Sequence, residues 1–231
     1  MMKTYIITIS YRARDNQSFR REQIIKTLEN IKEYFSQNNL KYIIIICEQN
    51  DNKQFNRGAL LNACFIEGER LLIQNKIYIQ IDADYLFNTQ HEFPKDILNF
   101  ETGFIDLYKF IDYDTIGACV FDSISYIKTN GYPNDLYGWG GDDWALCKRI
   151  HEKECEYKIF GYRTKNPPLI IEQTSPDKKL YFDETNNVLN IKLSKRNDTD
   201  LNGVRQCKYK IIKCGEFFNN KDIIHLLIEF I

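Results

Sequence analysis

The chain has 231 residues and a net charge of -1 at pH 7, with 43% hydrophobic and 14% aromatic residues. This composition excludes a disordered chain, and charge this close to neutral, spread without a polybasic patch, excludes an electrostatic footprint for nucleic acid. The apolar runs are far shorter than the roughly 20 residues of a membrane span, and residues 4–9 resemble a strand more than a signal peptide. Seven cysteines in no zinc or redox spacing favour reduced thiols. We therefore expect a cytoplasmic globular protein.

Strands and helices alternate over the first eighty residues. Runs of β-branched residues predict buried strands at residues 5–10, 42–47 and 77–81. Apolar side chains at helical spacing predict one helix beginning near Ser18 and another over residues 56–73. This order predicts an α/β fold, a mostly parallel sheet flanked by helices, with ligands at the carboxyl ends of its strands.

The pattern is weaker in the rest of the chain. Strands are expected at residues 115–121, 158–160, 169–172 and 208–214, and a short helix at 123–129. Residues 222–230 fit a helix or a strand. The polar residues 174–190 predict a loop that is a candidate lid. No linker or repeat separates a second domain, so we expect one domain over residues 1–231.

Polar and charged side chains follow each predicted strand of the first half. Asp82-Ala83-Asp84 comes directly after the third strand, where two carboxylates can hold Mn²⁺ or Mg²⁺; a solvated loop pair is the alternative. Arg12 and Arg14 follow the first strand and can grip phosphate oxygens, unless they are surface arginines. Phe55 and Arg57 follow the second strand. Without further context, Phe55 fits a residue of the hydrophobic core and Arg57 fits a surface residue.

Both tryptophans of the chain lie in Tyr137-Gly138-Trp139-Gly140-Gly141-Asp142-Asp143-Trp144. The glycines permit unusual backbone angles, and a helix is expected to begin near the two aspartates. An aromatic plate beside a carboxylate pair suits a sugar site, because the ring covers an apolar sugar face and the carboxylates bind hydroxyls or accept a proton. The alternative is a glycine-rich turn before a helix, with both tryptophans filling the core.

These motifs occur in an order that resembles the β-1,4-galactosyltransferase family. The resemblance runs from about residue 5 to about residue 213 and includes Asn130-Gly131-Tyr132-Pro133-Asn134 ahead of the central stretch. It implies an inverting glycosyltransferase with the type A nucleotide-diphospho-sugar (GT-A) fold. The single catalytic domain would consist of a nucleotide-binding half, 1–85, and an acceptor-binding half, 86–231.

The resemblance also implies a role for each motif. The uridine diphosphate of the donor would be held by Arg12, Arg14, Phe55 and Arg57, and the metal by Asp84 with Asp82. Trp139, Gly140, Gly141 and Asp142 would form the acceptor side. Asp143 would be the general base, and the metal would stabilise the departing diphosphate.

The sequence departs from the family pattern at three places. The family has a glutamate before the base, and this chain has Asp142. A family metal-binding histidine is replaced by Thr174, so Glu172 is a candidate substitute ligand. Thr115 stands where galactose-specific members have a tyrosine, which predicts room for the N-acetyl group of UDP-GalNAc beside UDP-Gal.

The function predicted from the sequence is a metal-dependent transfer of Gal or GalNAc from a UDP-sugar to a saccharide or glycan hydroxyl, with Mn²⁺ or Mg²⁺ as cofactor. One alternative is a catalytically impaired nucleotide-sugar or glycan-binding protein of the same fold. A nucleotidyltransferase is another, although it would not need Trp139 or the aspartate pair. Because no stem or anchor is visible, a microbial or viral cytoplasmic chain is expected.

Overall fold

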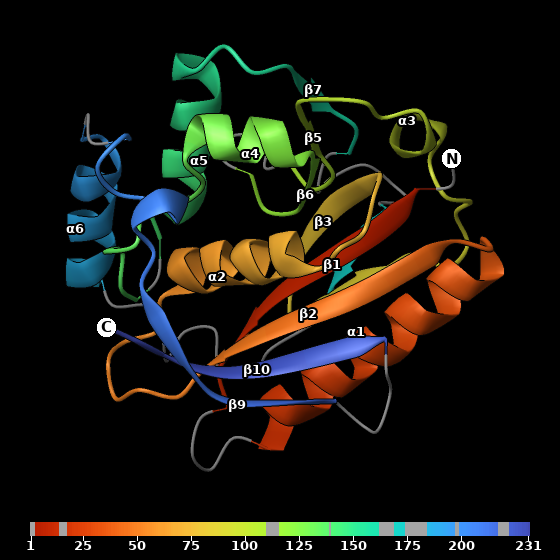
Figure 1. Cartoon of the computed structure of the whole chain (residues 1–231), viewed down its shortest axis with the longest axis horizontal. Coiled ribbons are helices and arrows are strands. Elements are labelled where there is room, and N and C mark those ends of the chain that lie inside the picture. The colour runs from red at the N-terminus through yellow and green to blue at the C-terminus, as the bar shows by residue number, and fades with distance from the viewer. Residues whose placement is uncertain are drawn as a thin grey trace.

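The computed structural model describes residues 3–13, 18–109, 116–138, 140–161, 169–173, 184–196, 199–216 and 222–231. Within these ranges the central sheet has eight strands (Figure 1). Their order is β7 (Tyr157–Ile159), β5 (Phe104–Asp106), β6 (Cys119–Phe121), β3 (Lys76–Asp82), β1 (Thr4–Tyr11), β2 (Lys41–Gln49), β10 (Ile223–Phe230) and β9 (Tyr209–Glu216).

The middle of this sheet is parallel. β1 pairs in parallel with both β2 and β3, and β10 joins the outer side of β2 in the same direction. β6 runs antiparallel to β3 and β5, and β9 runs antiparallel to β10. The prediction of a mostly parallel α/β sheet is confirmed, with strands β1, β2 and β3 where the β-branched runs place them.

Helices cover both faces of the sheet (Figure 1). α1 (Ser18–Gln37) and α3 (Lys95–Leu98) pack on one face, against side chains that include Ile7 and Ile9 of β1. α2 (Arg57–Arg70), α4 (Ser123–Thr129) and α5 (Asp142–Glu152) pack on the other face, against Ile6 and its neighbours. Side chains alternate along a strand, so β1 contributes to both cores.

A small second sheet extends the turn after β3. It pairs β4 (Tyr85–Phe87) with β8 (Ile170–Glu172) in antiparallel register. α6 (Glu184–Ser194) lies beside α5, and a short 3₁₀ turn, η2 (Val204–Gln206), precedes β9 (Figure 1). None of the described helices is long and apolar enough to cross a membrane.

Several predicted boundaries need correction. Residues 184–190 belong to helix α6 and not to a loop, because the helix packs against α5 and buries Asn190 and Ser194. Residues 174–183 of the predicted lid lie outside the described residues. The second helix ends at Arg70 and not at residue 73. Of the strand predicted at residues 115–121, only Cys119–Phe121 is a strand, and residues 222–230 resolve to strand β10.

Candidate active site

The carboxyl ends of the parallel strands bring the predicted motifs together. Tyr11 is the last residue of β1, Gln49 of β2 and Asp82 of β3, and the registers place these ends at one edge of the sheet. The N-terminus of α2 follows β2 at this edge, and it begins at Arg57. Asn56 caps the helix by accepting a hydrogen bond from the amide of Ala59 (2.9 Å).

Arg57 is the centre of the site. Its Nε lies 2.6 Å from Oδ1 of Asp82. Its Nη1 lies 2.7 Å from Oδ2 of Asp142 and 2.8 Å from Oδ1 of Asp143. Its Nη2 donates to the carbonyl of Gly117 at 3.1 Å. One guanidinium therefore gathers carboxylates from β3 and α5, and we name these four charged residues the Arg57 cluster.

The charge of the Arg57 cluster is unbalanced, with three carboxylates on one cation. Burial raises the pKa of Asp143 well above its ordinary value; Arg57 opposes this shift, and Asp142 and Asp82 add to it. Burial disfavours the charged guanidinium, but attraction to Asp143, Asp82 and Asp142 raises the pKa of Arg57. The arginine is thus locked in its charged form, and Asp143 has the raised proton affinity that suits a general base.

The glycine turn before α5 sets the direction of the two aspartates. Gly141 caps the helix with φ +88°. A Cβ at this position would lie 2.6 Å from the carbonyl oxygen of Asn190. Asp142 and Asp143 then occupy the first turn, where the helix dipole favours negative charge. The turn is tied down on one side because the Gly138 amide donates to the carbonyl of Phe55 (2.8 Å).

Asn62 holds the Asn130–Asn134 segment against α2. Its Nδ2 donates to the carbonyl of Tyr132 (2.7 Å) and to Oδ1 of Asn134 (2.9 Å). Its Oδ1 accepts from the amide of Tyr132 (3.0 Å) and the hydroxyl of Tyr126 (2.8 Å). The Tyr132 ring then lies under the guanidinium of Arg57, 5.7 Å from ring centre to Cζ. The Asn130–Asn134 segment therefore packs against Arg57 through the Tyr132 ring.

The three predicted metal ligands face different partners. Asp82 contacts Arg57, Asp84 lies 3.7 Å from Arg20, and Glu172 accepts a long hydrogen bond from the Tyr108 hydroxyl (3.4 Å). Among the residues that the structure describes, no group of three His, Cys, Asp or Glu side chains is placed to hold a metal ion. Two hard carboxylates at the end of β3 still fit a divalent cation that takes its remaining ligands from phosphate and water.

The other predicted site residues either contact groups outside the Arg57 cluster or lie outside the described residues. Arg12 donates to the backbone carbonyls of Asp51 (3.0 Å) and Lys53, so its guanidinium lies against the loop after β2. Phe55 is half-buried and packs against the α2 side of the core. Arg14, Thr115 and Trp139 lie outside the described residues. Gly140 is partly exposed and lies in the turn that precedes α5.

Two participants escaped the sequence reasoning. Gly117 contributes a backbone carbonyl, which no residue type reveals. Arg20 contacts Asp84 from the first turn of α1, and the signal was present: arginines at positions 20 and 21 place positive charge where a helix usually carries negative charge.

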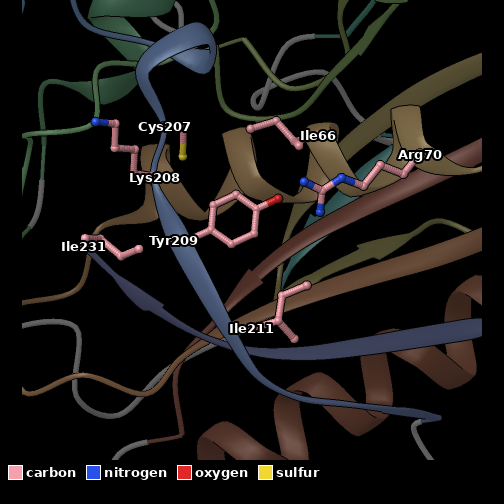
Figure 2. Close-up of a pocket in the computed structure, with 7 residues that line it drawn as sticks. All are labelled: Ile66, Arg70, Cys207, Lys208, Tyr209, Ile211 and Ile231. Carbon is pink, nitrogen blue, oxygen red and sulfur yellow. The ribbon is translucent and has the colours of Figure 1, made fainter.

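A surface pocket lies apart from the Arg57 cluster. Figure 2 shows it between the C-terminal half of α2 and β9. Its volume is about 400 Å³. It is lined by Ile66, Arg70, Cys207, Lys208, Tyr209, Ile211 and Ile231. None of these residues belongs to the predicted site.

Comparison with known proteins decides the family. Residues 2–93 match the N-terminal region of glycosyl transferase group 7, and residues 103–170 match a galactosyltransferase domain described as N-terminal. The chain belongs to the β-1,4-galactosyltransferase family. β-1,4-Galactosyltransferase 4 of Mus musculus is 27% identical over 139 residues, which are 57% of this chain and 39% of that protein. β-1,4-Galactosyltransferase 3 of Cricetulus griseus is 24% identical over 169 residues, 70% of this chain and 39% of that protein.

The sequence alignments cover only part of these relatives, whereas the structural superposition covers the whole of this chain. This galactosyltransferase-family chain spans about 39% of the curated relatives it matches. The catalytic domain of Drosophila β1,4-galactosyltransferase 7, solved with xylobiose, superposes with a TM-score of 0.75 at 18% identity, covering 100% of this chain and 95% of that one. A mutant of that protein with manganese, UDP-Gal and xylobiose gives 0.74 at 17% identity. The GT-A-like fold prediction is confirmed.

One prediction from the sequence is wrong. We expected a microbial or viral cytoplasmic chain, but its relatives are animal galactosyltransferases of the Golgi type, from mouse, human and Drosophila among others. That prediction was drawn from not seeing an anchor in the sequence, which does not determine where the protein works.

Proposed function

We propose that this chain is a metal-dependent, inverting glycosyltransferase that moves a sugar from a UDP-sugar to a saccharide hydroxyl. The observation that carries the proposal is the Arg57 cluster, which joins Asp82 at the end of β3 to Asp142 and Asp143 at the start of α5. A donor-side carboxylate and two acceptor-side carboxylates thereby share one partly buried cation. Family membership and the Drosophila complex with manganese, UDP-Gal and xylobiose support the same reaction class.

Asp143 is proposed as the general base. It would take the proton of the acceptor hydroxyl while that oxygen attacks the anomeric carbon from the face opposite the diphosphate. A single displacement of this kind inverts the anomeric configuration. Its raised pKa favours proton uptake, and the hydrogen bond from Arg57 orients the carboxylate and opposes part of that rise. Asp142, Gly140, Gly141 and Trp139 are proposed to bind the acceptor.

The donor would lie at the carboxyl edge of β1 to β3. Asp84 and Asp82 would hold Mn²⁺ or Mg²⁺, which when bound stabilises the negative charge of the leaving diphosphate. Arg12, Arg14 and Phe55 are proposed to bind the uridine diphosphate. Arg57 is given a different role from the one implied by the family resemblance, since its hydrogen bonds go to carboxylates and a carbonyl. It positions the acid groups.

The donor sugar is proposed to be Gal or GalNAc. Threonine is smaller than the tyrosine of galactose-specific members, so Thr115 should leave room for an N-acetyl group at C2 of the donor, and UDP-GalNAc should be used at least as well as UDP-Gal. A preference for UDP-Gal of tenfold or more in kcat/KM would contradict this point and leave the transferase proposal intact.

The test is a UDP-release assay with UDP-Gal, UDP-GalNAc, UDP-Glc and UDP-GlcNAc, each with Mn²⁺ or with chelator. Glucose, xylose, GlcNAc and glucuronate serve as acceptors, and NMR of the product reads the anomeric configuration. We expect metal-dependent turnover of one donor with inversion. Tight UDP binding without turnover on any pair would favour a binding protein of the same fold, and retention of configuration would exclude the single displacement.

A further inference from the structure

Arg20 contacts the acidic turn that follows β3. It lies in the first turn of α1, with Nη1 3.7 Å from Oδ2 of Asp84 and 3.2 Å from Oε1 of Gln23. The side chain of Asp84 is 14% exposed and that of Arg20 is 27% exposed. An arginine from the opposite face of the sheet to Arg57 thus reaches the second carboxylate of the Asp-x-Asp turn.

The position of Arg20 is costly for the helix. α1 has no acidic residue in its first turn, and it has arginines at positions 20 and 21 instead. Positive charge at a helix N-terminus opposes the helix dipole. A residue that breaks a local rule in this way often does so for function.

The contact with Asp84 is loose enough to be exchanged. Its 3.7 Å separation is well beyond the roughly 2.7–2.9 Å of a charge-assisted hydrogen bond. Partly exposed pairs of this kind contribute little to stability. A divalent cation at Asp84 would therefore displace Arg20 easily, and the freed guanidinium would lie beside the bound cation.

Two of the three arginines first expected to bind phosphate contact protein groups in the structure, and the third, Arg14, lies outside the described residues. Arg12 donates to the carbonyls of Asp51 and Lys53. Arg57 is held by Asp82, Asp142 and Asp143. Arg57 holds Asp82 of the acidic turn at 2.6 Å, whereas the ion pair of Arg20 with Asp84, at 3.7 Å, is the looser of the two at this turn.

Building on the proposed glycosyltransferase function, we propose that Arg20 is an additional donor-site residue that shares Asp84 with the divalent cation. Without the cation, Arg20 neutralises Asp84 and competes with metal binding. When the cation engages Asp84, the guanidinium of Arg20 binds a phosphate oxygen of the nucleoside diphosphate, to which its planar fork is matched. Metal and diphosphate binding are thereby coupled through one side chain.

The experiment measures two affinities by calorimetry: Mn²⁺ alone, and UDP at saturating Mn²⁺. The variants are Arg20→Gln, Arg20→Lys and the neighbouring control Arg21→Gln, whose side chain is exposed. For Arg20→Gln we expect Mn²⁺ alone to bind about two- to fivefold tighter, because the competing cation is gone, and UDP to bind about tenfold weaker. Both affinities of Arg20→Lys should lie between those of the wild type and Arg20→Gln. Both affinities of Arg21→Gln should match the wild type within twofold. Thermal unfolding confirms that each variant is folded.

The outcomes separate this inference from the proposed function. If wild-type protein binds UDP with Mn²⁺ while Arg20→Gln matches Arg21→Gln in both affinities, the role of Arg20 is wrong and the transferase proposal stands. Tighter Mn²⁺ binding with unchanged UDP affinity contradicts the contact with the diphosphate. If wild-type protein binds neither ligand, the proposed function fails and the role of Arg20 fails with it.

Discussion

Arg57 is the residue on which the site depends most. Replacing it with Gln leaves three carboxylates together without their cation, and breaking a buried ion pair in this way costs about 3 kcal/mol or more. We expect Arg57→Gln to lose at least that much free energy of unfolding in urea at pH 8. Arg12→Gln is the control, since Arg12 contacts only backbone carbonyls near the surface, and it should change stability by less than about 1 kcal/mol.

The pH dependence of that loss follows from Asp143. Its folded-state pKa is raised by burial, so the folded protein holds more protons than the unfolded chain between the unfolded pKa of about 3.9 and the higher folded value. Stability therefore falls as pH rises through this window. Without Arg57 the pKa of Asp143 rises further, so the deficit of Arg57→Gln should be smaller at pH 5 than at pH 8. An equal deficit at both values would contradict this electrostatic role.

Much of the site could be predicted from where the strands end. Arg57 and Asp82 follow predicted strands and were expected at the carboxyl edge of the sheet, and the structure brings them within hydrogen-bonding distance. Asp143 was linked to this site only by the family resemblance, and it too lies within hydrogen-bonding distance of Arg57. What the sequence could not provide is side-chain direction. Arg57 was expected to face a phosphate, but it faces carboxylates, because α5 returns its N-terminus to the same edge. That approach depends on the packing of the Asn130–Asn134 segment, which involves residues far apart in the chain.

At the scale of elements, the glycine turn before α5 is the critical joint. Gly141→Ala forces a side chain into the left-handed region at φ +88° and against the carbonyl of Asn190. Strain of this kind and overpacking together cost about 2–4 kcal/mol. Gly215→Ala is the matched control, because a Cβ at Gly215 in β9 meets nothing within 4 Å. Urea unfolding should show the large loss for Gly141 only. Equal effects at both glycines would contradict the role of the turn.

The elements missed from the sequence share a physical cause. Residues 184–190 of α6 were expected to belong to a loop because the stretch is polar. The helix nevertheless buries Asn190 against the glycine turn, where Nδ2 donates to the carbonyl of Tyr137 (2.9 Å). β4 has three residues and is defined only by its pairing with β8. Long-range packing fixes both, whereas the buried strands β1 to β3 are fixed by their own β-branched residues.

At the scale of the whole molecule, ligand binding should stabilise the fold. A ligand present at 100 times its Kd adds about 2.7 kcal/mol, which for a chain of 231 residues corresponds to a rise in Tm of about 5–10 °C. We expect this rise with UDP and Mn²⁺ together, measured by scanning calorimetry, and a much smaller rise with UDP and chelator. A full rise without metal would contradict the metal bridge at the end of β3.

The measurement that tests the central claim most directly compares Asp143→Asn with wild type in two assays, UDP release with acceptor and UDP binding with Mn²⁺. Removing a general base should lower kcat by about a hundredfold or more, while the UDP Kd stays within about threefold, because the base acts on the acceptor. Near-normal turnover in Asp143→Asn would show that Asp143 is not the base. Loss of UDP binding would place Asp143 on the donor side and contradict the division of roles around Arg57.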